Sequence, residues 1–516
     1  MYPTLEKLNW PEIEREILSF WKENEIFQKS VEQNPKDQSF TFFEGPPSAN
    51  GMPGIHHVMA RAMKDIFCRY KTLQGYRVER KGGWDTHGLP IELQVEKRLG
   101  IRKDDIGEKI SVAEYNKECR EDVLKFKDKW DDLTERIGFW LDLDNPYITY
   151  ENNYIETLWS LLKKLHDKGL LYKGYTIQPF SPAAGTGLSS HELNQPGTYQ
   201  DVKDTTVVAQ FKKVDKDNEF FIAWTTTPWT LPSNTALAVG AKIEYEDIQT
   251  FNVYTGDSII VTLASALVPK YFNSENEKQN QEELVYTKGE KNLPWLRLNK
   301  CTGRDLEGQR YEQLMPYAQP DNGDAFKVIL GDFVSTEDGT GIVHIAPSFG
   351  ADDFRVAQKN SMGSLTLVNK EGRFNENVTD FAGEFVKAGY LTEEEKADEA
   401  AKQGRDKYLS VDERIAIKLK TENRAFKVEK YEHSYPHCWR TDKPILYYPL
   451  ESWFIKTTAV KDRLVELNKT INWKPQSTGT GRFGNWLENL VDWNLSRSRF
   501  WGTPLPIWRT EDNSEE

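Results

Sequence analysis

The sequence predicts one α/β domain interrupted by a β-rich insertion. Near the amino terminus a strand-like run, a Gly/Pro loop and a long helical pattern follow one another, and a second strand-like run ends in another Gly-rich turn. This repetition is typical of parallel α/β units. Between about residues 200 and 350, short β-type runs separated by turns replace it, and α/β character returns after about residue 430.

The amino-terminal elements follow from local signals. Pro11 takes the first position of a helix expected over residues 10–27, where apolar residues recur at helical spacing. A strand is expected over residues 40–43, and the Gly/Pro loop at 45–51 leads from it into a helix over about residues 55–73.

The remaining elements are assigned in the same way. In chain order we expect a strand at 75–78 before a Gly turn at 82–85, helices over about 112–137 and 151–168, β-type runs at 205–211 and 220–224, a polar surface loop at 273–283, a charged, Ala-rich helix at 391–407 and a β-type run at 444–448.

The composition is that of a folded protein and not of a disordered chain. Of 516 residues, 38% are apolar and 28% are charged, and the formal net charge is −13. This acidic balance excludes a polybasic nucleic-acid binder, so any contact with nucleic acid has to come from a local patch. The length is enough for about three to four structural units.

The cysteines and the start of the chain favour the cytoplasm. Cys68, Cys119, Cys301 and Cys438 lie too far apart for a C-x-x-C zinc ribbon or a disulfide framework, so a reducing compartment fits best. Met1–Lys7 contains no apolar signal core, and no run of about 18 uncharged apolar residues occurs. We therefore expect a cytoplasmic protein without a membrane span.

The loop at 45–51 is the first candidate for chemistry. It stands at the carboxyl end of a predicted strand and opens onto a helix N-terminus, where free backbone N–H groups and the helix dipole favour phosphate. No Gly-Lys-Ser/Thr follows, so an ordinary P-loop is excluded. His56 and His57 begin the helix, either as hydrogen-bond donors to phosphate or as ordinary helix-start residues.

A carboxylate after the next Gly turn is the second candidate. Asp85 follows Gly83 and Trp84, and its charge suits an ammonium group of a substrate. The alternative is a helix cap, which is the commoner use of Asp after such a turn.

Two polar segments of the β-rich insertion form the third candidate. Their polar residues include Thr225, Thr226, Thr227, Asn234, His344, Asp352 and Asp353. Consecutive threonines also suit an ordinary strand, because β-branched residues pack well on a pleated surface. Neither segment offers metal-ligand spacing or a nucleophile beside its base, so hydrolysis there would use a positioned water molecule.

Together these motifs resemble the isoleucyl-tRNA synthetase family. The resemblance rests on the Gly45-Pro46-Pro47 loop, the two histidines, and the runs 83–92, 224–234, 339–344 and 492–504. It spans nearly the whole chain in the family's order. The valyl and leucyl families share the architecture but carry different residues at 84–92 and 496–504, so isoleucine is favoured.

The resemblance implies a Rossmann-type class I synthetase catalytic domain interrupted by a β-rich editing insertion. The first half of the catalytic domain, with an N-terminal helix and connective helices, would occupy residues 1–195, the editing domain 196–400, and the return to the catalytic domain 401–516. Such an enzyme forms isoleucyl-adenylate from isoleucine and ATP, with Mg²⁺, and passes the isoleucyl group to tRNA(Ile). A monomer is expected.

For the synthetic site the resemblance implies roles for Pro46, Gly54, His56, His57, Asp85, Trp453 and Trp493. The histidines would reach phosphate, and Asp85 would bind the isoleucine ammonium group beside Pro46. The two tryptophans would enclose the isoleucine side chain and the reaction site, unless they are core aromatics.

For the insertion it implies hydrolysis of valyl-tRNA made in error. A missing methylene is worth only about 1–3 kcal/mol of discrimination, the recognised limit for this family, so a second site is needed. The residues implied to line the pocket are Thr225, Thr226, Thr227 and Asn234. His344 would contact the terminal adenosine or assist the water, and Asp353, or its neighbour Asp352, would anchor the α-ammonium.

The chain departs from the family at three places. The family's His-x-Gly-His signature is replaced by Gly54-Ile55-His56-His57, with the first and third positions exchanged. The Lys-Met-Ser-Lys-Ser loop and the anticodon-binding region do not occur, so we expect the N-terminal part of a longer enzyme. The segment Tyr435–Thr441 lacks the family's second cysteine, and no zinc is inferred from it.

Two rival interpretations remain open from the sequence. The altered histidines and the missing lysine loop favour a synthetase remnant that acts only as a trans-editing aminoacyl-tRNA hydrolase. A non-catalytic tRNA-binding module is the other, and the acidic charge speaks against it.

Overall fold

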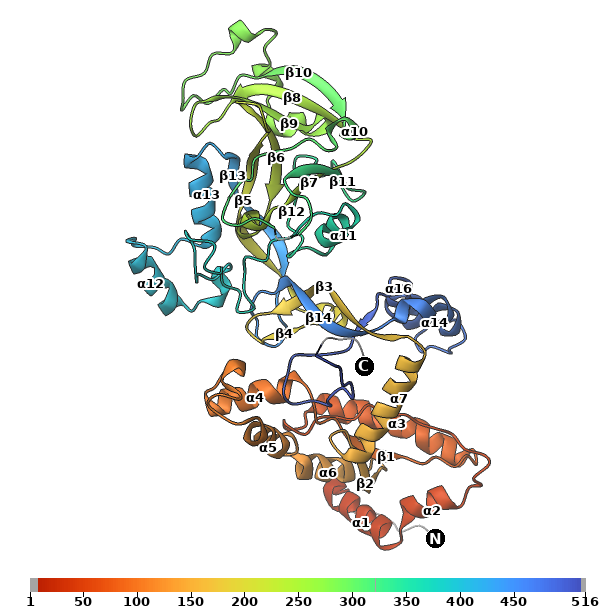
Figure 1. Ribbon diagram of the computed structural model, residues 1–516. Helices are drawn as coiled ribbons and strands as arrows, with labels where there is room; N and C mark the ends of the chain where they lie inside the picture. Colours follow the sequence, from red (N-terminus) through yellow and green to blue (C-terminus); the bar gives the residue numbers. More distant parts are fainter. Residues whose placement is uncertain (1–7, 321, 512–516) are drawn as a thin grey trace. The chain divides into compact units, whose positions relative to one another are not determined.

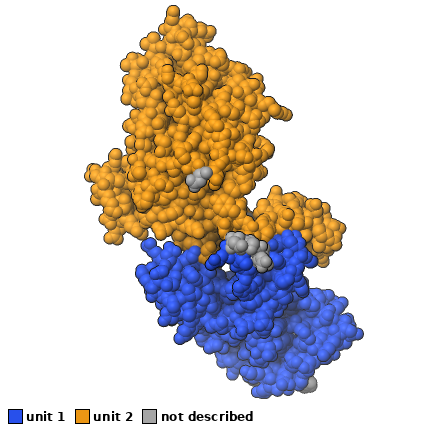
Figure 2. Space-filling model, in the orientation of Figure 1, with its two compact units in different colours: residues 1–171, 499–516 blue, residues 172–498 orange. Residues whose placement is uncertain are grey.

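Two units make up the chain, and the second interrupts the first in sequence (Figure 2). Unit 1 comprises residues 1–171 and 499–516, and unit 2 comprises residues 172–498. The computed structural model describes residues 8–320 and 322–511. Met1–Lys7, where the sequence contains no signal core, lie outside the described residues.

Unit 1 confirms the α/β class (Figure 1). Its strands β1 (Lys81–Trp84) and β2 (Asp142–Ile148) pair in parallel, with Trp84 opposite Ile148. Its helices are α1 (Trp10–Glu23), α2 (Ile26–Glu32), α3 (Ile55–Leu73), α4 (Leu89–Leu99), η1 (Lys103–Asp105), α5 (Val112–Val123), α6 (Lys127–Arg136) and α7 (Asn152–Asp167).

The long helix predicted over 55–73 is confirmed by α3, and two other helical patterns are divided. The pattern over 10–27 breaks after Glu23, because Glu25 adopts a left-handed φ of 49° before α2 begins. The pattern over 112–137 breaks between α5 and α6. The helix predicted over 151–168 is confirmed by α7.

Two predicted strands of unit 1 are wrong. Residues 40–43 form no ladder with any described strand; next to them, only Ser39 makes a bridge, to Arg77. At 75–78 the chain is still leaving α3, with Gly75 at a φ of +90°. Strand structure begins instead at β1, because β2 supplies the backbone hydrogen-bond partners of β1.

The described residues of unit 2 form three sheets, which confirms a β-rich insertion (Figure 1). The strand order is β10-β8-β9-β6-β5-β13 in the largest, β11-β7-β12 in the second and β15-β14-β3-β4 in the third. The strands are β3 (Leu171–Ser181), β4 (Thr186–Gly187), β5 (Tyr199–Lys212), β6 (Glu219–Thr225), β7 (Ala236–Val239), β8 (Glu244–Phe251), β9 (Ser258–Ala264), β10 (Leu296–Thr302), β11 (Lys327–Leu330), β12 (Ile342–Ile345), β13 (Ala425–Pro436), β14 (Leu446–Ile455) and β15 (Trp493–Asn494).

Short helices connect these strands. They are α8 (Ser190–Leu193), η2 (Pro228–Ser233), η3 (Ser265–Leu267), α9 (Val268–Tyr271), η4 (Ser274–Asn276), η5 (Gln281–Glu283), α10 (Gly303–Leu306), α11 (Ala351–Lys359), η6 (Ala388–Tyr390), α12 (Glu393–Lys402), α13 (Val411–Thr421), η7 (Thr457–Val460), α14 (Lys461–Asn468), α15 (Gln476–Thr480) and α16 (Arg482–Glu488). Among the described residues, no helix is long and apolar enough to cross a membrane.

The core of unit 2 lies where the sheets meet. Phe221 of β6, Leu237 of β7 and Val328 of β11 are fully buried in one hydrophobic cluster, which packs the six-stranded sheet against the three-stranded one. β13 lies in the predicted segment 401–516 and pairs antiparallel with β5 along its length. The domain boundaries expected after residues 195 and 400 stay predictions.

Candidate functional site

A cavity of about 390 Å³ in unit 2 brings together most of the polar residues predicted in the insertion. Its lining includes Thr225, Thr226, Thr227, His344 and Asp353. The threonines come from the end of β6, the histidine from β12 and the carboxylate from the first turn of α11. Asn234 does not line the cavity, but its side chain contacts His344.

The threonines form a folded-back turn instead of a continuing strand. Oγ1 of Thr225 accepts the backbone N–H of Thr227 over 3.1 Å, and the hydroxyl of Thr230 donates to the backbone oxygen of Thr227 over 2.8 Å. Pro228, which has no N–H to lose, starts the 3₁₀ turn η2 at this point. These side-chain contacts to backbone end β6 and turn the segment along the cavity.

Both ring nitrogens of His344 are held by hydrogen bonds. The Tyr311 hydroxyl donates to Oδ1 of Asn234 over 2.7 Å, which turns the Asn234 amide group so that Nδ2 lies 3.0 Å from Nδ1 of His344. Nδ1 is therefore an acceptor, and the ring proton resides on Nε2, 2.8 Å from Oγ1 of Thr230. Burial lowers the pKa of His344 to about 4, so the ring is neutral at neutral pH.

Two carboxylates line the cavity: Asp338, which pairs with Lys270 at 2.8 Å, and Asp353. Oδ2 of Asp353 accepts the N–H of Ala346 over 2.8 Å, and a Cβ at Gly350 would lie 2.7 Å from its Cγ, so a glycine leaves room for the carboxyl group. Burial raises the pKa of Asp353 to about 7. The neighbouring Asp352 is exposed and pairs with Arg355 at 3.0 Å. A cationic group in the cavity therefore meets Asp353 and not Asp352.

In unit 1 the Gly/Pro loop and the turn at Asp85 lie together. The backbone N–H of Asp85 donates to the carbonyl of Pro47 over 3.0 Å, directly after Pro46. Desolvation raises the pKa of Asp85, and a hydrogen bond from the backbone of His87 opposes this. The N-cap of α4 is Gly88, so the helix-cap alternative for Asp85 does not hold.

The exchanged signature forms the start of α3. Gly54 is the N-cap, and its N–H donates to Nδ1 of His57 over 2.9 Å, which places the proton of the neutral ring on Nε2. The rings of His56 and His57 are 3.8 Å apart between centroids. Burial, and then the neighbouring His56 and Arg61, lower the pKa of His57.

A buried carboxylate joins two of the motifs within unit 1. Oε1 of Glu92 accepts the N–H groups of Phe500 at 3.1 Å and Trp501 at 3.0 Å, and Oε2 pairs with Nε of Arg499 at 2.6 Å. The indole N–H of Trp501 donates to the carbonyl of Thr86 over 2.7 Å. The run 83–92 is thereby tied to a segment about 400 residues later, a role that the sequence did not assign to Glu92.

Trp453 and Trp493 lie on neighbouring strands of unit 2. Trp493 on β15 is opposite Ile455 of β14, and the N–H of Trp453 donates to Oγ of Ser496 over 2.9 Å. Trp493 is 54% exposed, which rules out a core aromatic at that position. The residues implied for synthesis are thus divided between the units: Trp453 and Trp493 belong to unit 2, and Pro46 and Asp85 belong to unit 1.

Comparison with known proteins identifies the family. The family described as tRNA synthetases class I (I, L, M and V) matches residues 16–516. The chain belongs to this family. The isoleucine–tRNA ligase of Cytophaga hutchinsonii is 67% identical, over 99% of this chain and 47% of its own length. Those of Bacteroides fragilis and Porphyromonas gingivalis are 60% and 56% identical, over 98% and 99% of this chain and 46% and 47% of their own lengths.

This class I synthetase chain therefore spans about half the length of the curated relatives it matches. A solved ternary complex, Agrobacterium radiobacter K84 agnB2 LeuRS-tRNA-LeuAMS, is 17% identical over 50% of this chain and 41% of that chain. Its TM-score of 0.30 is too low to support an argument about the fold.

Two residues beside the cavity of this synthetase were missed in the sequence. Thr230 lines the cavity and bonds to His344; a hydroxyl side chain between Pro228 and Pro232 was the available signal. Tyr311, which orients Asn234, lies outside every motif, and no local pattern connects it with a partner 77 residues away.

Proposed function

We propose that the chain is the amino-terminal portion of an isoleucine–tRNA ligase and that the cavity of unit 2 hydrolyses valyl-tRNA(Ile) formed in error. The observation that carries the editing proposal is the convergence of the Thr225–Thr227 turn, His344 and Asp353 on one cavity. The identity with curated isoleucine–tRNA ligases supports the ligase proposal. The four cysteines are free thiols, which supports a cytoplasmic location.

In the ligase reaction, isoleucine and ATP, with Mg²⁺ on its phosphates, are the proposed substrates. The Asp85 carboxylate is proposed to pair with the ammonium group of isoleucine, beside the loop that carries Pro46. His57 offers its Nε2–H to phosphate, and His56 lies beside it at the start of α3. Trp453 and Trp493 are proposed to enclose the isoleucine side chain.

In the editing reaction, Asp353 is proposed to hold the α-ammonium group of the valyl ester. Water adds to the ester carbonyl carbon, the bond from that carbon to the ribose oxygen breaks, and the ribose oxygen takes up the proton that the water loses. The products are valine and uncharged tRNA. No side chain on the cavity lining is an activated nucleophile, so the step depends on how the water and the ester are positioned.

His344 is proposed to orient the Thr230 side chain and not to accept a proton from water. Its Nδ1 accepts from Asn234 and its Nε2–H donates to Thr230, so the neutral ring has no lone pair available for a proton from water. It therefore holds the Thr230 hydroxyl, and the Asp353 carboxylate is proposed to supply the charge that binds the substrate, because Asp338 is paired with Lys270.

Isoleucine-dependent pyrophosphate exchange by the whole enzyme tests the ligase proposal. Exchange with isoleucine supports it, and its absence together with hydrolysis of valyl-tRNA(Ile) would favour the trans-editing remnant. Loss of hydrolysis in an Asp353→Ala variant of the 516-residue chain tests the cavity separately.

A further inference from the structure

A buried carboxylate outside the cavity caps the turn that lines it. Oδ1 of Asp412, in the first turn of α13, accepts the backbone N–H of Trp229 over 2.8 Å. Trp229 lies near the start of η2, and its indole and backbone are buried at 2% exposure. Without Asp412 this N–H would be left buried and unpaired, which is unfavourable.

The capped turn carries the contacts of His344. Thr230, the next residue after Trp229, bonds to Nε2 of the ring, and Asn234, the first residue after η2, bonds to Nδ1. A shift at the start of η2 therefore displaces Thr230 first, whereas Asn234 is held separately by the Tyr311 hydroxyl.

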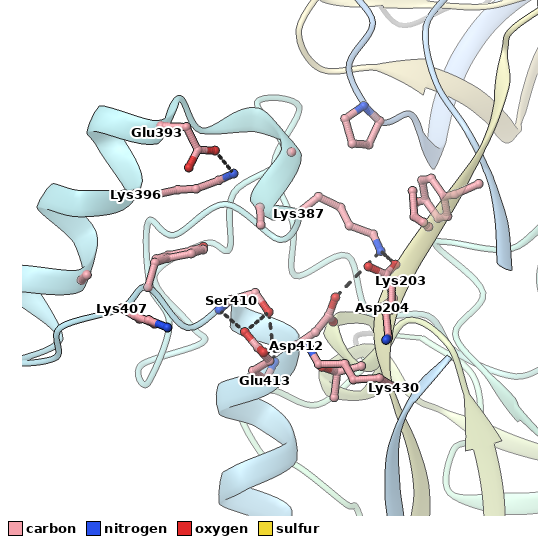
Figure 3. Close-up of a pocket in the computed structure, with 18 of the residues that line it drawn as sticks. Lys203, Asp204, Lys387, Glu393, Lys396, Lys407, Ser410, Asp412, Glu413 and Lys430 are labelled. Carbon is pink, nitrogen blue, oxygen red and sulfur yellow. Dashed lines mark hydrogen bonds and ion pairs between the residues drawn. The ribbon is translucent and has the colours of Figure 1, made fainter. Parts of the chain in front are cut away.

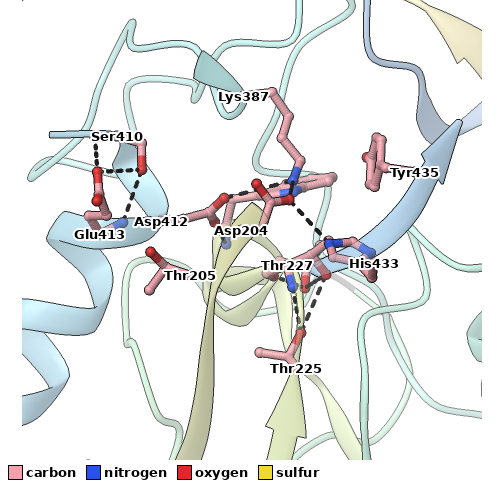
Figure 4. A network of polar contacts seen from close by, with 12 residues as sticks. Asp204, Thr205, Thr225, Thr227, Lys387, Ser410, Asp412, Glu413, His433 and Tyr435 are labelled. Atoms are coloured by element: carbon pink, nitrogen blue, oxygen red, sulfur yellow. Dashed lines mark hydrogen bonds and ion pairs between the residues drawn. The ribbon is translucent and has the colours of Figure 1, made fainter. Parts of the chain in front are cut away.

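Asp412 is itself fixed by a buried ion-pair network (Figure 4). Lys387 lies 3.8 Å from Asp412 and 2.7 Å from Asp204, and His433 approaches Asp204 at 3.4 Å. Asp412 and Lys387 are each only 5% exposed. The Lys387 ammonium group pairs with both carboxylates. The position of each of the three side chains therefore depends on the other two.

Asp204, Lys387 and Asp412 also line a second cavity of unit 2, of about 560 Å³ (Figure 3). Several of its charged side chains pair with one another, namely Lys387 with Asp204, Lys396 with Glu393 and Lys430 with Glu413, each at 2.7 Å. Asp412 therefore lines one cavity and caps the turn that lines the other.

We propose that Asp412 is a positioning residue for the editing cavity: by capping η2 it holds Thr230, and through Thr230 the ring of His344, in the arrangement that hydrolysis requires. This inference rests on the proposed editing function. Lys387 and Asp204 fix Asp412, and none of the three lines the editing cavity.

The chemistry of the carboxyl group suggests the rescue variant. Burial raises the pKa of Asp412 to about 7, while the charge of Lys387 opposes this. An acceptor oxygen is present in the neutral carboxyl group as well as in the carboxylate. Asparagine offers the same oxygen, so Asp412→Asn keeps the cap and Asp412→Ala removes it.

Hydrolysis of valyl-tRNA(Ile) by variants of the 516-residue chain tests the proposal. Asp412→Ala is expected to lower kcat by up to about 100-fold, the effect of a misplaced catalytic arrangement, with KM unchanged. Asp412→Asn is expected to restore kcat. Glu413→Ala is the matched control, because Glu413 caps the same helix through Ser410 and does not touch η2. Equal losses in Asp412→Ala and Glu413→Ala, or no rescue by Asp412→Asn, would overturn the proposal.

A double-mutant cycle separates positioning from general destabilisation. In a Thr230→Ala background, Asp412→Ala is expected to add little further loss of kcat, because its effect passes through Thr230. Additive losses would contradict that route.

The ring of His344 gives a readout that needs no activity. In ¹⁵N-histidine spectra the wild-type chain, Asp412→Asn and Glu413→Ala are expected to keep one Nε2–H tautomer, and Asp412→Ala to lose it. Unchanged His344 signals in Asp412→Ala would overturn the inference, whereas a wild-type chain with these signals but no hydrolysis would refute only the editing function.

Discussion

The side chain of His57 accepts a hydrogen bond from the backbone N–H of Gly54 over 2.9 Å. Between them in sequence, His56 turns its ring towards the same glycine, where an added Cβ would lie 2.9 Å from Cε1 of the ring. The glycine and the histidine that are exchanged relative to the family signature therefore occupy adjoining space. We therefore expect the two positions to be coupled.

The first prediction follows from this contact. In the whole enzyme, Gly54→His alone is expected to crowd His56, and His56→Gly alone removes one imidazole, so each is expected to slow adenylate formation more than the double exchange does. Isoleucine-dependent pyrophosphate exchange by the four combinations measures this. Additive effects of the two changes would show that the exchange is incidental.

The second prediction compares two neighbouring carboxylates. Asp353→Ala is expected to lower hydrolysis of valyl-tRNA(Ile) by about 100-fold, because the substrate ammonium loses both its partner and its position. Asp352→Ala, in the same helical turn, is expected to leave the rate unchanged, because Asp352 pairs with Arg355 outside the cavity. If the two variants lost the same activity, the roles would be wrongly assigned.

The third prediction concerns pH. The pKa of Asp353 is raised from its ordinary value to about 7, so the carboxylate that is proposed to bind the substrate ammonium group is depleted as the pH falls through 7. kcat/KM for valyl-tRNA(Ile) is therefore expected to decrease below that pH, with a limiting slope of about tenfold per pH unit. His344, with its pKa lowered to about 4, stays neutral and adds no step there.

An Asp353→Asn variant is the control for the pH profile. It removes the titrating group while keeping its shape, so the low activity that remains is expected to show no step near pH 7 beyond that of uncatalysed ester hydrolysis. A step of unchanged size in this variant would assign the titration to another group, with Asp412 as the next to test.

The fourth prediction concerns the stability of unit 1. Glu92→Ala is expected to lower the free energy of unfolding by about 3–5 kcal/mol, because it leaves the buried Arg499 with only part of its counter-charge. Glu118→Ala breaks the surface pair with Arg98 and is expected to cost no more than about 1 kcal/mol. Urea denaturation of the chain compares the two, and similar losses would show that Glu92 does not hold the 499–501 segment.

Much of the fold could be predicted from local pattern. The apolar spacing over 55–73 predicts α3, and the β-type runs at 205–211 and 220–224 lie within β5 and β6. Residues 40–43 have strand-like composition but no strand beside them among the described residues, and a strand needs a partner that its own residues do not specify.

The residues in and around the candidate cavity also fall into two groups, those that the sequence predicts and those that it does not. Thr225–Thr227, His344 and Asp353 stand in motifs, so their residue types predicted a polar site. The contact of Asp412 with Trp229 spans 183 residues, and neither residue carries a local signal for the other. Only the folded chain reveals that α13 caps η2.

The unit 2 cavity is proposed to be an editing site, and the hydrolysis predictions all depend on this assignment. The most direct test is the rate at which the 516-residue chain hydrolyses valyl-tRNA(Ile) and isoleucyl-tRNA(Ile) in parallel. We predict hydrolysis of the valyl ester faster by about 10- to 200-fold, the discrimination that one methylene allows, and its loss in Asp353→Ala. Equal rates for the two esters, or a rate that Asp353→Ala leaves unchanged, would contradict the account.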